Sequence, residues 1–327
     1  MIDNQNYTPL PTIPVVDPVP SGIQRPLWSV MIPTYNCAEF LVQALQSVLS
    51  QDPGPEHMQI EVVDDCSTLD DPEKVVREIG MGRVTFYRQP KNGGVTNSFN
   101  TCIRRSRGHL VHILHGDDYV LDGFYRKTES EFNENQSVSL IASRSFFVDE
   151  LNIIQGVTKH ISSLSNASKN PAEFFYECPI QCPGVVVRRK FYENLGGFDH
   201  SLLHSADWEM WTRAIGSSGG VVLSDVLACY RQTSGNDTGR LMKTAENLRD
   251  YERLASIFEA RYDEYNLKKG MKIISVKALQ QAARFKSLGD YEAETKNLKY
   301  WKSRTPLMFR IMKYASVIIK ESVFNQR

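Results

Sequence analysis

Several features that would place this chain in a common class of protein are absent from its sequence. Basic and acidic residues number 38 each, so the chain lacks the positive excess that nucleic-acid binding requires. No apolar run approaches the roughly 20 residues of a membrane-spanning helix. The N-terminus also lacks the basic segment and the apolar run of a secretory signal. We therefore expect a cytoplasmic protein that has no nucleic-acid partner.

Sequence signatures of metal and phosphate binding are equally scarce. The six cysteines form no Cys-x-x-Cys pair, which argues against a zinc site and favours reduced thiols. The sequence contains neither the Gly-x-x-x-x-Gly-Lys loop of nucleotide triphosphatases nor the Gly-x-Gly-x-x-Gly fingerprint of dinucleotide-binding folds. If the protein binds a phosphorylated ligand, its phosphates must therefore be neutralised in another way.

Prolines and hydrophobic periodicity define the first two parts of the chain. Six prolines fall within residues 9–26, which predicts a flexible, Pro-rich leader over residues 1–27. From Trp28 to about residue 120, short apolar runs alternate with segments of helical spacing, and this alternation predicts parallel strands connected by helices. Residues 28–240 are therefore assigned to an α/β domain with a Rossmann-like, mostly parallel sheet flanked by helices.

A C-terminal α-helical extension is predicted over residues 241–327. Part of it resembles a two-helix hairpin broken at Gly289. The last stretch, residues 305–327, places apolar residues on one helical face and basic residues on another. Such a basic amphipathic helix either packs its apolar face on the protein or makes peripheral contact with an anionic membrane, here at the cytoplasmic face.

Polar residues follow three of the predicted strands. The runs "WSVMIPTYN", "MQIEVVDD" and "HLVHILHGDD" each pass from apolar residues into such groups. Because the carboxyl ends of parallel strands meet at one edge of a sheet, we expect these groups to lie together. Each group taken singly is also compatible with an ordinary turn.

Carboxylates at such an edge suit sugar and metal ligands. Asp65 could accept a hydrogen bond from a nucleobase, while Asp117 and Asp118 could hold a ribose hydroxyl and a divalent ion. Mg²⁺ and Mn²⁺ prefer oxygen ligands and bridge diphosphates. A metal at this edge would then neutralise a departing diphosphate in place of the missing phosphate-binding loops.

Six segments of the chain form an ordered set of motifs. They are "SVMIPTYNCAEFLVQALQSVLSQ", "IEVVDDCST", "NGGVTNSFN", "LHGDDYVLDGFY", "LGGFD" and "ADWEMWTRA". Together they resemble the motifs of family 2 glycosyltransferases with the GT-A fold, over residues 28–240. The resemblance implies an inverting transfer of one sugar from a nucleotide-diphosphate sugar, usually a UDP-sugar, to an acceptor hydroxyl.

The resemblance also implies roles for particular residues. Asp65 would meet the base, Asp117 would contact the ribose, and Asp118 with Asp117 would bind Mn²⁺ or Mg²⁺. Asp207, at the start of a predicted helix whose dipole favours its charged form, would be the general base, although alone it could equally be an N-cap. The nucleotide pocket would be lined by Pro33, Thr34, Tyr35 and Asn36.

Three positions depart from the family pattern. His115 stands where the family often has an acid, Phe99 lies in a segment that often carries arginine, and Ala206 precedes the base where glutamate is common. Because a phenylalanine cannot pair with a phosphate, we assign diphosphate binding to the metal or to Arg231.

The acceptor and two other functions stay open at this point. The Gln-x-x-Arg-Trp motif of processive synthases is missing, which favours transfer of a single sugar to a glycan, a lipid-linked acceptor or a protein. Such an enzyme would act in polysaccharide, glycolipid or glycoprotein glycan assembly. The same acids would also suit a metal-dependent nucleotidyltransferase or phosphohydrolase, or a non-catalytic, transferase-like binding subunit.

Overall fold

The computed structural model describes residues 12–233 and 237–305. They belong to two compact units that divide between Thr233 and Ser234, a few residues before the boundary predicted at residue 240. The first unit contains a nine-stranded sheet flanked by helices, which confirms the predicted α/β class. The second unit is helical, as the sequence predicts.

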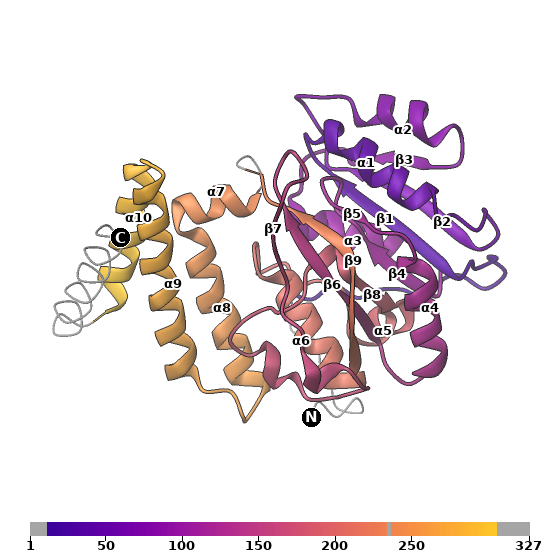
Figure 1. Cartoon of the computed structure of the whole chain (residues 1–327). Coiled ribbons are helices and arrows are strands. Elements are labelled where there is room, and N and C mark those ends of the chain that lie inside the picture. Colours follow the sequence, from indigo (N-terminus) through magenta and orange to yellow (C-terminus); the bar gives the residue numbers. More distant parts are fainter. Residues whose placement is uncertain (1–11, 234–236, 306–327) are drawn as a thin grey trace. The chain divides into compact units, whose positions relative to one another are not determined.

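The sheet is mixed, with a parallel half that comes first in the sequence. The strands are β1 (Trp28–Thr34), β2 (Met58–Asp64), β3 (Thr85–Arg88), β4 (Leu110–Ile113), β5 (Tyr119–Val120), β6 (Leu140–Val148), β7 (Ile154–Val157), β8 (Val185–Arg188) and β9 (Gly220–Arg231). Their order is β3-β2-β1-β4-β8-β6-β9-β5, and β7 pairs with β6 (Figure 1). β1, β2, β3 and β4 are parallel to one another, whereas β8 is antiparallel to β4 and β6.

Helices connect the parallel strands, as the alternating pattern predicts. In the first unit they are α1 (Ala38–Leu49), α2 (Pro72–Gly80), α3 (Val95–Arg105), α4 (Phe124–Glu134), α5 (Arg189–Leu195) and α6 (Ala206–Ser218). In the second unit they are α7 (Asp237–Thr244), α8 (Glu246–Arg261), α9 (Leu267–Ser287) and α10 (Tyr291–Arg304).

Alternation along the central strands explains why helices cover both faces of the sheet. Trp28, Val30 and Ile32 of β1 belong to one hydrophobic cluster with buried residues of α1, α2 and α4. Ser29, on the opposite face, donates a hydrogen bond to Gln59 of β2 at 2.6 Å. Successive side chains of a strand point to opposite faces. Because every residue of β1 is buried, both faces of the sheet are covered at this strand.

Residues 12–17, which lie within the predicted leader, contact the α/β domain. Ile13 is buried, and the N–H of Gly197 donates to the carbonyl of Pro14 at 2.9 Å. Gly196 has φ +86°, and a Cβ there would lie only 2.6 Å from Cγ2 of Ile13. The segment therefore holds the loop between α5 and α6. The leader before residue 12 lies outside the described residues.

The second unit contains the predicted hairpin. Helices α9 and α10 lie side by side (Figure 1), and Gly289 takes φ +73° in the turn between them. Asn266 and Asp290 cap the two helices by accepting N–H groups of their first turns. The predicted basic amphipathic helix lies beyond Thr305, outside the described residues. Among the described helices, none has the length and the apolar character to cross a membrane.

We expect Ile13→Ala to destabilise the α/β domain. The substitution leaves a cavity beneath the loop between α5 and α6, and burial of an isoleucine side chain makes such a change cost about 2 kcal/mol or more. Val15→Ala serves as the control because Val15 is 78% exposed, and its effect should stay within about 0.5 kcal/mol. Thermal denaturation of both variants tests this expectation, and equal midpoints would show that the segment contributes nothing to stability.

Candidate active site

Backbone hydrogen bonds join the carboxyl ends of β1, β2 and β4. The N–H of Asp65 donates to the carbonyl of Thr34, and the N–H of Gly116 donates to the carbonyl of Pro33, both at 2.9 Å. A Cβ at Gly116 would lie 2.9 Å from Oγ1 of Thr34, so this close approach requires glycine. The three polar strand ends therefore lie together, as the sequence predicts.

Three side chains with metal-binding atoms meet at this edge. One ligand atom from each of His115, Asp117 and Asp118 lies within 4.8 Å of the others. Asp118 is almost fully buried, and its Oδ1 accepts the backbone N–H of Arg231 at 2.8 Å. Its Oδ2 is buried without a hydrogen-bond partner in the described part of the chain. Burial and the neighbouring Asp117 carboxylate raise the pKa of Asp118.

The chemistry of these three residues fits a divalent cation. A buried carboxylate oxygen that accepts no hydrogen bond has lost its hydration without compensation. A bound cation would supply the missing favourable interaction. Carboxylate oxygens are the ligands preferred by Mg²⁺ and Mn²⁺. Asp118 and Asp117 therefore suit the predicted metal. Burial lowers the pKa of His115, so its ring is neutral near pH 7 and keeps a lone pair.

Arg231 is a buried residue whose guanidinium is bound within the protein, and its predicted role in binding the diphosphate stays a prediction. The side chain is 1% exposed, and its guanidinium lies over the ring of Phe40, 4.7 Å from the centroid. A guanidinium has five N–H donors, and the protein has acceptors for all five. These acceptors are the carbonyls of Asp117, Asp149 and Glu150 and the side chains of Gln43 and Asn152, at 2.6–3.4 Å.

The loop after β1 is tied to the loop after β2 through Asn36. Oδ1 of Asn36 accepts the N–H groups of Thr68 and Leu69 at 2.9 and 3.0 Å, and its backbone has φ +49°. Tyr35, beside it, is 45% exposed. An exposed aromatic ring at a strand end suits stacking on a base. The predicted nucleotide contacts of both residues stay predictions.

Asp65 uses its carboxylate within the protein. It accepts hydrogen bonds from Nε2 of Gln89 and from the N–H groups of Gly93 and Gly94, at 2.7–2.8 Å. Burial raises the pKa of Asp65. The carboxylate thus orders the loop before α3, and its contact with a nucleobase stays a prediction.

Asp207 lies in the first turn of α6, on a helix that is firmly anchored. Its Oδ1 accepts the N–H of Trp208 at 2.7 Å. Two turns of the helix are locked by a fully buried ion pair between Glu209 and Arg213, 3.0 Å apart. Nη2 of Arg213 also donates to the carbonyl of Gly197 at 2.7 Å. The helix therefore holds the half-buried Asp207 in a defined place, where the helix dipole favours a carboxylate.

The buried thiol of Cys182 lies within electrostatic range of both Asp118 and Asp207. Cys182 belongs to the short 3₁₀ turn before β8. Its Sγ donates to the carbonyl of Ile113 at the end of β4, at 3.6 Å. Burial raises the pKa of Cys182, and the carboxylates of Asp207 and Asp118 raise it further. Both carboxylates therefore lie within electrostatic range of one atom.

A comparison with known families decides the class of this protein. Residues 29–196, just over half of the chain, match the family model described as "Glycosyl transferase family 2". The chain belongs to glycosyl transferase family 2. It is therefore a glycosyltransferase that uses a nucleotide-sugar donor, and the resemblance drawn from the motifs is confirmed.

Relatives and solved structures agree with this family. An uncharacterized protein of Mycobacterium tuberculosis is 27% identical over 70% of this chain and 75% of its own. A fragment of S. aureus TarS in complex with UDP-GlcNAc has a TM-score of 0.53 at 16% identity, covering 84% of this chain and 92% of its own. A mannosyltransferase of Pyrobaculum calidifontis, in complex with GDP-Man and Mn²⁺, has a TM-score of 0.52 at 16% identity, covering 93% and 83%. The two structures confirm the GT-A fold.

Sequence reasoning missed one contact in this glycosyltransferase. Phe99 and His115 stack, with ring centroids 5.2 Å apart and planes at 17°. Each residue departs from the family pattern by itself, and the two changes fall in motifs far apart in the sequence. The joint occurrence of the two departures in one sequence was the available signal of a contact. Only the fold shows that Phe99 and His115 touch.

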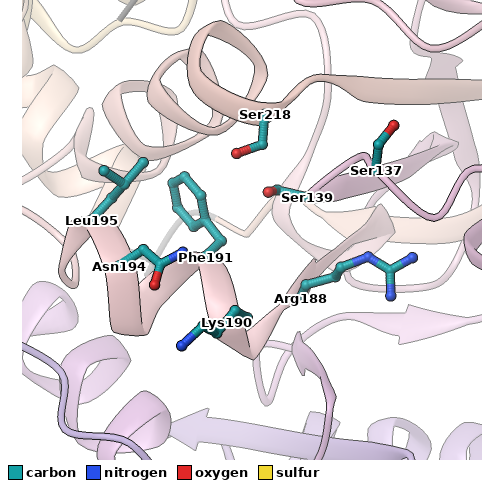
Figure 2. A pocket seen from close by; sticks show the side chains of 8 residues that line it. All are labelled: Ser137, Ser139, Arg188, Lys190, Phe191, Asn194, Leu195 and Ser218. Carbon is teal, nitrogen blue, oxygen red and sulfur yellow. The ribbon is translucent and has the colours of Figure 1, made fainter. Parts of the chain in front are cut away.

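A cavity of about 170 Å³ lies at the opposite edge of the glycosyltransferase sheet (Figure 2). Arg188, on its wall, pairs with Leu110 at the start of β4, whereas Asp117 follows the end of that strand. The cavity is therefore separate from the acidic site. None of the predicted site residues lines it; its walls are Ser137, Ser139, Arg188, Lys190, Phe191, Asn194, Leu195 and Ser218.

We expect Arg231→Met to destabilise the α/β domain. Removing the guanidinium leaves buried carbonyls without donors, each at a cost of about 1–3 kcal/mol, so the free energy of unfolding should fall by at least about 3 kcal/mol. Arg126→Met is the control because Arg126 is exposed. Thermal denaturation and UDP binding are measured on both variants. An unchanged midpoint together with lost UDP binding would instead indicate that Arg231 binds the diphosphate.

Proposed function

We propose that this enzyme transfers one sugar from a UDP-sugar to an acceptor hydroxyl with inversion at the anomeric carbon. One observation carries the proposal: Oδ2 of Asp118 is buried without a partner among the described residues, and the carboxylates of Asp118 and Asp207 both lie close enough to the Cys182 thiol to raise its pKa. A site for a charged diphosphate thus adjoins a carboxylate on an anchored helix. The UDP-GlcNAc complex of the TarS fragment supports the choice of UDP.

The donor would bind across the carboxyl ends of β1, β2 and β4. Tyr35 offers an exposed ring to the base, and Pro33, Thr34 and Asn36 form the adjoining wall. Asp65 orders the loop at Gly93 and Gly94 and would also contact the base. Asp117 would accept a ribose hydroxyl. A divalent cation held by Asp118 and Asp117 would neutralise the negative charge of the departing diphosphate, and the Mn²⁺ complex of the Pyrobaculum mannosyltransferase supports such an ion.

Asp207 would act as the general base. Its carboxylate accepts the proton of the acceptor hydroxyl as the hydroxyl oxygen forms a bond to the anomeric carbon. The bond between that carbon and the diphosphate oxygen breaks on the opposite face, and its electron pair leaves with the diphosphate. Attack opposite the leaving group inverts the configuration. The buried pair of Glu209 and Arg213 keeps Asp207 in place for this step.

The acceptor is proposed by class only. A glycan, a lipid-linked acceptor or a protein would each present a hydroxyl to Asp207, in polysaccharide, glycolipid or glycoprotein glycan assembly. A phosphohydrolase or nucleotidyltransferase at the same acids would release pyrophosphate or monophosphate without moving a sugar. A screen of UDP-, GDP- and dTDP-sugars for thermal stabilisation with Mn²⁺ identifies the donor, and analysis of the products then separates these reactions.

We expect a divalent cation to tighten UDP binding through Asp118. Isothermal titration of UDP with and without Mn²⁺ should show stronger binding with the ion, and Asp118→Ala should remove that difference because the buried ligand is lost. The control is Asp122→Ala, at an exposed carboxylate nearby, which should behave as the wild type. UDP binding that does not depend on metal in the wild-type protein would count against the metal site.

We expect Asp207→Asn to retain the affinity for UDP and to lose turnover by at least about 100-fold, the usual scale for a general base. The amide keeps the size of the carboxylate but cannot take the proton. Turnover is followed as the release of UDP from the donor found in the screen, with water as the acceptor. Asp122→Asn is again the control. An unchanged rate in Asp207→Asn would move the base to another residue.

A further inference from the structure

We propose that His115 is a third protein ligand of the divalent cation and that it shifts the site from Mg²⁺ towards cations that accept a nitrogen ligand, such as Mn²⁺. This inference rests on the proposed function, which places the cation at Asp118 and Asp117. It assigns a role to the position where the family pattern often has an acid.

The spacing of the two side chains suits a shared ion. Nδ1 of His115 lies 3.6 Å from Oδ2 of Asp118, which is too long for a hydrogen bond. Two ligand atoms that each lie about 2.1 Å from one ion are separated by about 3.0–3.7 Å, depending on the angle between them. The separation of 3.6 Å lies within this range, so one cation could bind both atoms.

Oδ2 of Asp118 is buried without a hydrogen-bond partner within the described residues. Buried polar atoms are nearly always paired, so this oxygen points to a missing ligand. A cation bound between Oδ2 of Asp118 and Nδ1 of His115 would give Oδ2 its partner and would leave the ring proton of His115 on Nε2.

Phe99 fixes the plane of the imidazole. The two rings are nearly parallel, 5.2 Å apart between centroids, and Phe99 is itself held against Phe198, 4.9 Å away. Phe99 is 3% exposed, so its ring has no room to swing aside. A ligand held in one orientation costs little ordering entropy on binding. Phe99 is thus a positioning residue for the imidazole.

A nitrogen ligand changes which ion the site prefers. Mg²⁺ demands oxygen ligands in near-ideal octahedral geometry and gives up its water reluctantly. Imidazole suits later, softer divalent metals, and Mn²⁺ accepts it more readily than Mg²⁺ does. If His115 is one of the ligands, replacement of Mg²⁺ by Mn²⁺ gains a metal–nitrogen bond that Mg²⁺ forms poorly.

The first test detects the nitrogen directly. Electron spin echo envelope modulation of Mn²⁺ bound to the full chain with UDP should show a coupling to a directly bound ¹⁴N. The coupling should vanish in His115→Asp and in His115→Gln, the second variant avoiding a third buried carboxylate. His57→Asp carries the same substitution at an exposed histidine and should keep the coupling. Persistence of the coupling in both His115 variants would overturn the proposal.

The second test measures selectivity. The dissociation constants of Mn²⁺ and Mg²⁺ are determined in the presence of UDP, and their ratio is compared between proteins. His115→Asp should reduce the preference for Mn²⁺ by at least about 10-fold, the scale on which groups around a metal tune its affinity. An unchanged ratio would overturn the proposed role. Failure of the wild-type protein to bind Mn²⁺ with UDP would instead refute the metal site itself, so the two proposals fail in different ways.

Discussion

The acidic site depends on the buried guanidinium of Arg231. Its charge is matched by carbonyl and amide oxygens drawn from three separate parts of the chain, and its backbone N–H holds one oxygen of Asp118. A buried cation without such partners would cost several kcal/mol. The network therefore ties the turn at Asp117 and Asp118 to the end of β9 and to the loop after β6.

That conformation leaves the remaining oxygen of Asp118 buried and facing His115. A carboxylate in this state has an unfavourable charge until a cation or a proton joins it, so the burial of Asp118 favours the binding of a cation at the carboxyl ends of the strands. The half-buried Asp207 is held by a different network, the ion pair of Glu209 and Arg213. Asp118 and Asp207 are thus positioned by separate networks, and both carboxylates lie within electrostatic range of the Cys182 thiol.

Much of this arrangement could be predicted from the sequence. Apolar runs and helical spacing predicted the parallel half of the sheet, and the motifs predicted that its polar strand ends would meet. Solvent exposure and hydrogen-bond partners, however, are not visible in a linear pattern. Arg231 ends strand β9, and its side chain is buried against five acceptors. The prolines before Trp28 indicated flexibility, yet Ile13 fills a space over Gly196 that only the folded loop creates.

The sequence by itself determined the class of the fold, the family and the meeting of the polar strand ends at one edge, because strand periodicity and motif order are local properties of the chain. Only the tertiary structure decided how each side chain at that edge is used. It committed Arg231 and Asp65 to internal hydrogen bonds, and it left one oxygen of Asp118 without a donor among the described residues. It also stacked Phe99 on His115. These outcomes depend on contacts between segments far apart in the sequence, where burial sets the cost of every unpaired polar atom.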